Sequence, residues 1–304
     1  MKHYFYFTDD HIWFLRDIAK SNYASLFDSP YLGFYRDMYQ KYGHKVQINC
    51  FYQTDESYND EYFDMSMMPD KYKNEWIANA HWLRLAFHAR KEFPDYPYIN
   101  ADYDVVAADL KLIKNEIIRF AGEETFSNDT VIHWGPMSKD GCRALKDGGI
   151  RMINLSSGAY LPRDNEEDQL SEDHKARLRQ NRKPETRCVY SLELKCGAPV
   201  GNNHREDIDG KLSCGDFITV PDSESGLMFL HMWDITLNNF TPEENAASTR
   251  ALADRDFVGF GTHEQYFWPF YKNYRADYKE RMEAAIRVAA ELGAKPVFVN
   301  EMPE

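Results

Sequence analysis

The stretch HYFYFTDDH, residues 3–11, decides how the fold begins and poses its first chemical question. Its run of Tyr and Phe predicts a β-strand over residues 3–7, and residues 11–20 predict a helix directly after it. A strand that leads into a helix is typical of α/β folds. The adjacent carboxylates Asp9 and Asp10 repel each other, so they either cap that helix or hold a positive group.

The rest of the chain continues this alternation of strands and helices. Further strands are predicted at 45–52, 82–88, 130–134, 150–155, 226–230, 257–262 and 295–300. Further helices are predicted at 31–42, 70–79, 102–121, 138–147 and 276–292. Strands joined by crossover helices form a parallel sheet or barrel, so we expect an irregular (β/α) barrel of about seven or eight strands.

A polar, densely charged segment interrupts this rhythm. We expect residues 160–186 to form an excursion from the repeating strands and helices, or a short helix pair. We expect residues 187–220 to form a loop-rich β segment. No internal repeat or low-complexity tract is visible. We therefore expect a single domain over residues 1–304 with a polar insertion at about 160–220.

The composition excludes some classes of binding partner for this protein. The net charge is −13, with 49 acidic against 36 basic residues, which argues against a nucleic acid or an anionic membrane. No stretch reaches the roughly 18 apolar residues of a membrane span, and Asp9 and Asp10 fall where a signal peptide would be apolar. We expect a cytoplasmic protein; its oligomeric state is left open. Aromatic residues make up 15% of the chain. Tyr and Trp suit surfaces that are both apolar and hydrogen-bonding, such as sugar-binding clefts, although core packing explains most of the aromatic residues.

Ionisable side chains stand at five predicted strand ends. They are Asp9 and Asp10, His88, His133, His231 with Asp234, and His263 with Glu264. In parallel folds the carboxyl ends of strands carry the functional groups. Converging carboxylates and imidazoles suit zinc or a similar divalent metal, and a second carboxylate beside the ion can take a proton from water. Neighbouring side chains on a strand point to opposite sides, so both aspartates face one cavity only if the strand is kinked.

Each of these residues also has a structural alternative. Asp9 or Asp10 could cap the helix at 11–20, and His133 could be a hydrogen-bonded core histidine. The residues expected to line the cavity are His133, Trp134, His231, Asp234 and Glu264.

The first strand resembles a family motif. Polysaccharide deacetylases of the NodB type have a strand ending in Thr-Phe-Asp-Asp-Gly, and this chain has Tyr6-Phe7-Thr8-Asp9-Asp10-His11. The resemblance implies that Asp9 is the general base and Asp10 a metal ligand. The third family motif has only a loose counterpart at residues 132–136, without its arginine.

A second stretch, LAFHARKE at residues 85–92, resembles the family's His-(Ser/Thr)-x-x-His motif. His88 matches the first histidine, and Glu92 stands at the position of the second. The resemblance implies a divalent metal, zinc in the first instance, on Asp10, His88 and Glu92. Residues four apart on a helical turn share one side, so a carboxylate could replace the imidazole.

The third point of resemblance is near the C-terminus. Thr262-His263-Glu264 precedes a predicted helix and strand, as the Leu-His motif does in the family. The resemblance implies that His263 is the general acid, and Leu230-His231 is a rival match.

Three functions follow from these observations. The first is a metal-dependent deacetylase of an N- or O-acetylated carbohydrate, a divergent member of the family. The second is a glycoside hydrolase on a related barrel, using Asp9 and another carboxylate such as Asp234. The third is an inactive carbohydrate-binding protein. In each case the expected partner is a small molecule or an oligosaccharide.

Overall fold

The computed structural model describes most of the chain outside the predicted insertion. The described residues are 1–58, 61–94, 97–98, 100–135, 137–154, 218–221, 225–231 and 234–301. All but the last three residues of the predicted insertion at about 160–220 lie outside them, so the single domain with an insertion stays a prediction. Among the described residues, no helix is long and apolar enough to cross a membrane.

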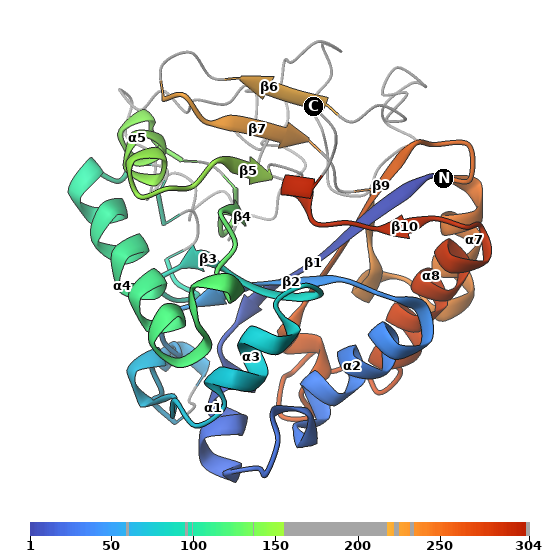
Figure 1. The fold of residues 1–304 in the computed structure, drawn as a ribbon, viewed down its shortest axis with the longest axis horizontal. Helices are drawn as coiled ribbons and strands as arrows, with labels where there is room; N and C mark the ends of the chain where they lie inside the picture. Colours follow the sequence, from blue (N-terminus) through green and yellow to red (C-terminus); the bar gives the residue numbers. More distant parts are fainter. Residues whose placement is uncertain are drawn as a thin grey trace.

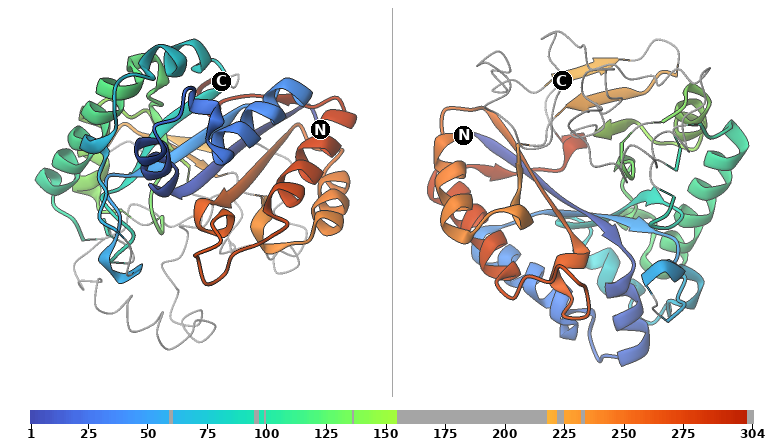
Figure 2. Two further views of the ribbon diagram at one scale, coloured as in Figure 1. Left: turned by 90° about the horizontal axis from the view of Figure 1, so that it is seen from below. Right: turned by 180° about the vertical axis from the view of Figure 1, so that it is seen from behind.

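The first sheet contains six parallel strands in the order β3-β2-β1-β9-β8, with β10 beside the beginning of β1. The strands are β1 His3–His11, β2 Val46–Phe51, β3 Leu83–Ala89, β8 Ile235–Thr236, β9 Phe257–His263 and β10 Lys295–Pro296. Figure 2 shows β1, in dark blue, running beside the orange β9. The N-terminal strand therefore lies in the middle of this sheet.

The second sheet has the order β4-β5-β7-β6. Its strands are β4 Asp129–Val131, β5 Met152–Asn154, β6 Ile218–Pro221 and β7 Met228–His231, and only β6 runs antiparallel to its neighbour. The two sheets meet where β3 passes β4: the backbone N–H of Ser127 donates to Leu85 O at 2.8 Å. Among the described strands, β8 and β6 do not pair with each other, so the fold is a parallel α/β fold whose described sheet is open.

Seven α-helices of the described chain surround the sheets (Figure 1). They are α1 Trp13–Ser21, α2 Pro30–Tyr42, α3 Lys73–Asn79, α4 Tyr103–Ala121, α5 Lys139–Asp147, α7 Pro242–Ala251 and α8 Tyr278–Glu291. The Tyr6 hydroxyl on β1 is 2.9 Å from that of Tyr35 on α2, and Tyr35 is 3.4 Å from the Tyr278 hydroxyl on α8. The even-numbered side chains of β1 therefore face helices.

The odd-numbered side chains of β1 face the second sheet. Phe5 and Phe7 pack with Val131 of β4 and Leu230 of β7 in a separate apolar cluster. Side chains alternate along a strand, so Asp9 continues the row of Phe5 and Phe7 on the face that we call the inner face. The apolar row fixes the register, because a shift by one residue would turn these rings toward the helices.

Most predicted elements lie within three residues of their observed ends. However, β1, predicted over residues 3–7, continues to His11, and β8 was not predicted. Two further differences concern α7 and the final strand. Helix α7 was not predicted, although Thr241-Pro242-Glu243-Glu244 carries a capping box whose two hydrogen bonds are both present. The final strand, predicted over 295–300, is only Lys295–Pro296. The reason is that later N–H groups bond to side chains: Phe298 N donates to Glu301 Oε2 and Asn300 N to Asp129 Oδ2, each at 3.1 Å.

Candidate metal centre

The end of β1 is kinked at Asp10. Its φ is +66°, in the left-handed region, and the pairing of β1 with β2 changes register between Thr8 and His11. Asp is among the few non-glycine residues that adopt this conformation readily. The kink that both aspartates need in order to face one space is therefore present.

Three side chains from three places in the sequence converge at this end of the strands. Asp10 Oδ1 lies 3.0 Å from His88 Nε2 and 3.0 Å from His133 Nδ1, and the two nitrogens are 3.2 Å apart. Asp10 is the penultimate residue of β1, His88 lies near the end of β3, and His133 follows β4 by two residues. All three residues are buried. Asp10 and His88, predicted to meet, do meet.

The other nitrogen of each imidazole is fixed by a backbone carbonyl. His88 Nδ1 donates to Val131 O at 2.5 Å, and His133 Nε2 donates to Glu92 O at 2.8 Å. Because a carbonyl oxygen only accepts, these nitrogens carry the ring protons. In neutral histidines, His88 Nε2 and His133 Nδ1 are then unprotonated, and both face a carboxylate oxygen.

Three acceptor atoms held together in this way require positive charge between them. Either additional protons or a metal ion can supply it, and the spacing suits an ion. Ligand atoms in a tetrahedral site with bonds of about 2.0–2.1 Å lie roughly 3.3 Å apart, close to the separations seen here. Outer hydrogen bonds that fix the histidine tautomer are typical of metal sites. Asp10, His88 and His133 therefore form a group that could hold a metal ion.

The two aspartates differ in their electrostatic surroundings. Burial disfavours the ionised form of Asp10, but its contacts with His133 and His88, when their inner nitrogens carry protons, outweigh burial and hold the pKa of this carboxyl well below its usual range. Burial raises the pKa of Asp9 to about 7, although the hydrogen bond from Asn49 opposes the rise. Asn49 Nδ2 donates to Asp9 Oδ1 at 2.7 Å. The pKa values of the two neighbouring carboxyl groups are therefore shifted in opposite directions.

Glu92, the third ligand implied by the resemblance, lies outside this three-residue group. Its carboxylate Oε2 accepts a hydrogen bond from Gln265 Nε2 at 3.1 Å, and it is its backbone carbonyl that contacts the cluster, through His133. His133, predicted only as a cavity residue and weighed against a core histidine, takes the third position. The available signal was its place at a strand end, which it shares with His88.

The other residues that were predicted at the site differ in what their side chains contact. Asp234 accepts from Arg255 Nη1 at 2.7 Å and from Gly259 N at 2.8 Å, so its carboxylate ties the chain before β8 to β9. Trp134 directly follows His133, and their ring centroids are 5.9 Å apart. His231 ends β7, but its side chain is not among those described. His263 ends β9, and its Nδ1 lies 3.0 Å from Asn238 Oδ1.

Glu264 is fully buried and caps α1 from the end of β9. Its carboxylate accepts hydrogen bonds from three backbone N–H groups and one indole, those of Ile12, Trp13, Phe14 and Trp268, at 2.5–3.0 Å. No side chain at the helix's own N-cap does so. The alternative in which Asp9 or Asp10 caps this helix is therefore not what the structure contains.

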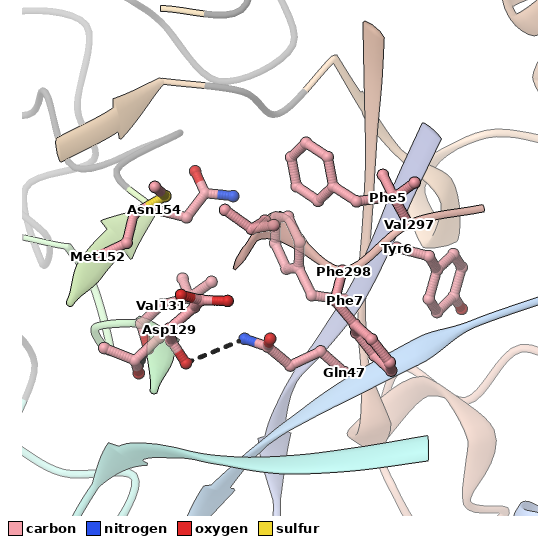
Figure 3. A pocket seen from close by; sticks show the side chains of 12 residues that line it. Phe5, Tyr6, Phe7, Gln47, Asp129, Val131, Met152, Asn154, Val297 and Phe298 are labelled. Carbon is pink, nitrogen blue, oxygen red and sulfur yellow. Dashed lines mark hydrogen bonds between the residues drawn. The ribbon is translucent and has the colours of Figure 1, made fainter. Parts of the chain in front are cut away.

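A separate cavity lies between the two sheets (Figure 3). Phe5, Phe7 and Phe298 stand on one side of it, and Asp129, Gln47 and Asn154 contribute its polar groups. Asp10, His88 and His133 are not among the residues that line this cavity, although Val131, which lines it, accepts the hydrogen bond from His88.

Comparisons with known proteins give a fold but no family. No protein-family model matches the chain, and no curated protein matches it. The resemblance to polysaccharide deacetylases therefore rests on its short motifs alone. Among solved structures, the chain is similar to the 4-alpha-glucanotransferase from Thermococcus litoralis, with a TM-score of 0.55 and 10% identity. The match covers 99% of this chain and 40% of that one, so the chain spans less than half of that protein. At this identity the likeness concerns the fold.

The contacts of Glu264 predict a large effect on stability. Replacing Glu264 by Gln turns an NH₂ group toward buried N–H donors, which lose their acceptor. We expect the free energy of unfolding to fall by roughly 1–3 kcal/mol, as for other buried unsatisfied donors. Urea denaturation measures this, with Glu280→Gln, an exposed change in the first turn of α8, as the control. Equal stability of the two variants would contradict the capping role.

Proposed function

We propose that this protein is a metal-dependent hydrolase that acts on a carbohydrate, with the cation held by Asp10, His88 and His133. The observation that carries the proposal is the convergence of three acceptor atoms, within 3.0–3.2 Å, on a buried point at the carboxyl ends of the strands. We further propose that the complete chain forms a (β/α) barrel of the glycoside hydrolase/deacetylase type. The parallel strands and the fold likeness support this.

The residues around the cluster fit hydrolysis. A divalent cation bound there would polarise a carbonyl and make a water molecule more acidic. In this proposal Asp9 takes the proton from that water. Asn49 binds Oδ1 of Asp9, so Oδ2 would be the accepting atom. For His263 the resemblance implies the role of general acid, and this stays a prediction.

Two observations support a carbohydrate as substrate. The similar solved structure is a 4-alpha-glucanotransferase, an enzyme whose name refers to glucans. In addition, Tyr58, Tyr266 and Tyr271 lie near enough to Asp10 for its charge to affect them. Aromatic rings with hydroxyl groups suit the apolar faces and polar edges of sugars.

The bond that is hydrolysed has two candidates. The proposed metal site favours an acetyl amide or ester, because a cation can polarise the carbonyl group of such a bond directly. The structural comparison supports the second candidate, a glycosidic bond, better than deacetylation. A glycosidase needs two facing carboxyl groups, about 5–5.5 Å apart for retention or roughly 6.5–9.5 Å for inversion. Asp234 does not suit that role, since Arg255 and Gly259 bind its carboxylate.

The proposed function predicts that the protein binds a metal ion. Chelator-treated protein titrated with Zn²⁺ in a calorimeter should bind one ion per chain. His133→Ala and Asp10→Asn should each weaken binding by more than the ~10–100-fold typical of outer-shell changes. Glu92→Gln is the matched control: it keeps the backbone carbonyl that holds His133 and should leave the affinity within a few-fold.

Asn suits Asp10's left-handed backbone, so Asp10→Asn removes charge with little strain. Unchanged affinity in both ligand variants would contradict the assignment of the site. A large loss in Glu92→Gln would restore Glu92 as a ligand.

Activity is the second prediction. The metal-loaded protein is assayed in parallel for acetate released from acetylated sugars and for reducing ends released from glucans. Asp9→Asn should lower kcat by ~10²–10⁴-fold, as expected for loss of a general base, without changing metal affinity. Acetate release supports the first candidate bond and new reducing ends the second. Sugar binding with neither product would favour the inactive carbohydrate-binding protein, and an active Asp9→Asn would remove the proposed base.

A further inference from the structure

Asn238 holds one edge of the His263 ring. The Oδ1 atom of Asn238 lies 3.0 Å from His263 Nδ1 and accepts from Thr262 Oγ1 at 3.2 Å. Asn238 is 1% exposed, and it belongs to the turn that joins β8 to α7. The contact therefore links the end of β9 to a buried side chain rather than to a surface group.

The orientation of the Asn238 amide is set by its other contact. Its Nδ2 donates to Asn239 Oδ1 at 2.9 Å, which turns Oδ1 toward Thr262 and His263. An amide oxygen only accepts, so His263 Nδ1 is the donor and carries the ring proton. The segment is further held by Arg281 Nη1, which donates to Asn238 O at 3.3 Å.

We infer that Asn238 is a positioning residue that holds His263 in the Nδ1-protonated form, with Nε2 as a proton acceptor. Nε2 lies on the edge of the ring away from Asn238, and the ring is within electrostatic range of Asp10, His88 and His133. An amide, unlike a carboxylate, adds no negative charge that would stabilise a doubly protonated imidazolium. Any group that meets Nε2 is then a hydrogen-bond donor or a cation.

This inference deepens the proposed function and rests on it for its catalytic meaning. A general acid must begin with a proton to give, whereas this tautomer of His263 begins with a lone pair. In the proposed reaction His263 therefore gives a proton only after Nε2 has received one.

The test is the protonation state of each His263 nitrogen, which needs neither substrate nor metal. Chelator-treated full-length protein labelled with ¹⁵N-histidine is examined by long-range ¹H–¹⁵N NMR at pH 8. The His263 signals are assigned by their loss in His263→Gln. We expect a protonated-type Nδ1 and an unprotonated-type Nε2 in the wild type.

Two substitutions separate positioning from a general structural role. Asn238→Leu removes the acceptor, and the two His263 nitrogens should move toward the averaged shifts of a mixture of tautomers. Asn238→Asp keeps an acceptor and should restore the protonated-type Nδ1. Asn79→Leu, which removes a side-chain acceptor of Trp82 Nε1 far along the chain, is the matched control and should leave the His263 signals unchanged.

The outcomes are distinct from those of the metal and activity assays. A protonated Nε2 in the wild-type spectrum overturns the inference, even if Asn238→Leu fails to fold. Unchanged His263 signals in a folded Asn238→Leu overturn the role of Asn238. Absence of metal binding or hydrolysis would instead contradict the proposed function and leave the tautomer as measured.

Discussion

The left-handed backbone of Asp10 is the constraint on which the rest of the site depends. In a regular strand, the row of Phe5, Phe7 and Asp9 would face the second sheet while Asp10 turned toward the helices. The φ of +66° breaks this alternation and brings Asp10 Oδ1 to 3.0 Å from His88 Nε2. Glu264 secures the chain just beyond the kink, because it accepts the first N–H groups of α1.

The cluster also links parts of the fold that are far apart in sequence. The carbonyls of Val131 and Glu92 each hold the outer nitrogen of one histidine, so the inner nitrogens of His88 and His133 point their lone pairs at a carboxylate. Such a group is unfavourable without positive charge, and burial increases the cost. Binding of a cation should therefore favour the folded arrangement of β1, β3 and β4 together.

Local patterns predicted much of this fold. A continuous run of aromatic residues predicted a strand over residues 3–7, the first part of β1. Helical periodicity with Gly293 after it predicted α8 within two residues at each end. The meeting of Asp10 and His88 also followed, because carboxyl ends of parallel strands lie together. His133 was harder to assign, since its contact with Asp10 depends on the turn after β4, where Trp134 has a φ of +61°. The cap by Glu264 joins residues some 250 positions apart, which no local pattern encodes.

The account is tested most directly by locating the ion. Crystals of zinc-loaded protein, measured at wavelengths on either side of the zinc absorption edge, give an anomalous difference map that identifies zinc by element. The account predicts one peak bonded, at about 2.0–2.1 Å, to Asp10 Oδ1, His88 Nε2 and His133 Nδ1. A peak elsewhere, or density with those three side chains turned away from one another, would contradict it.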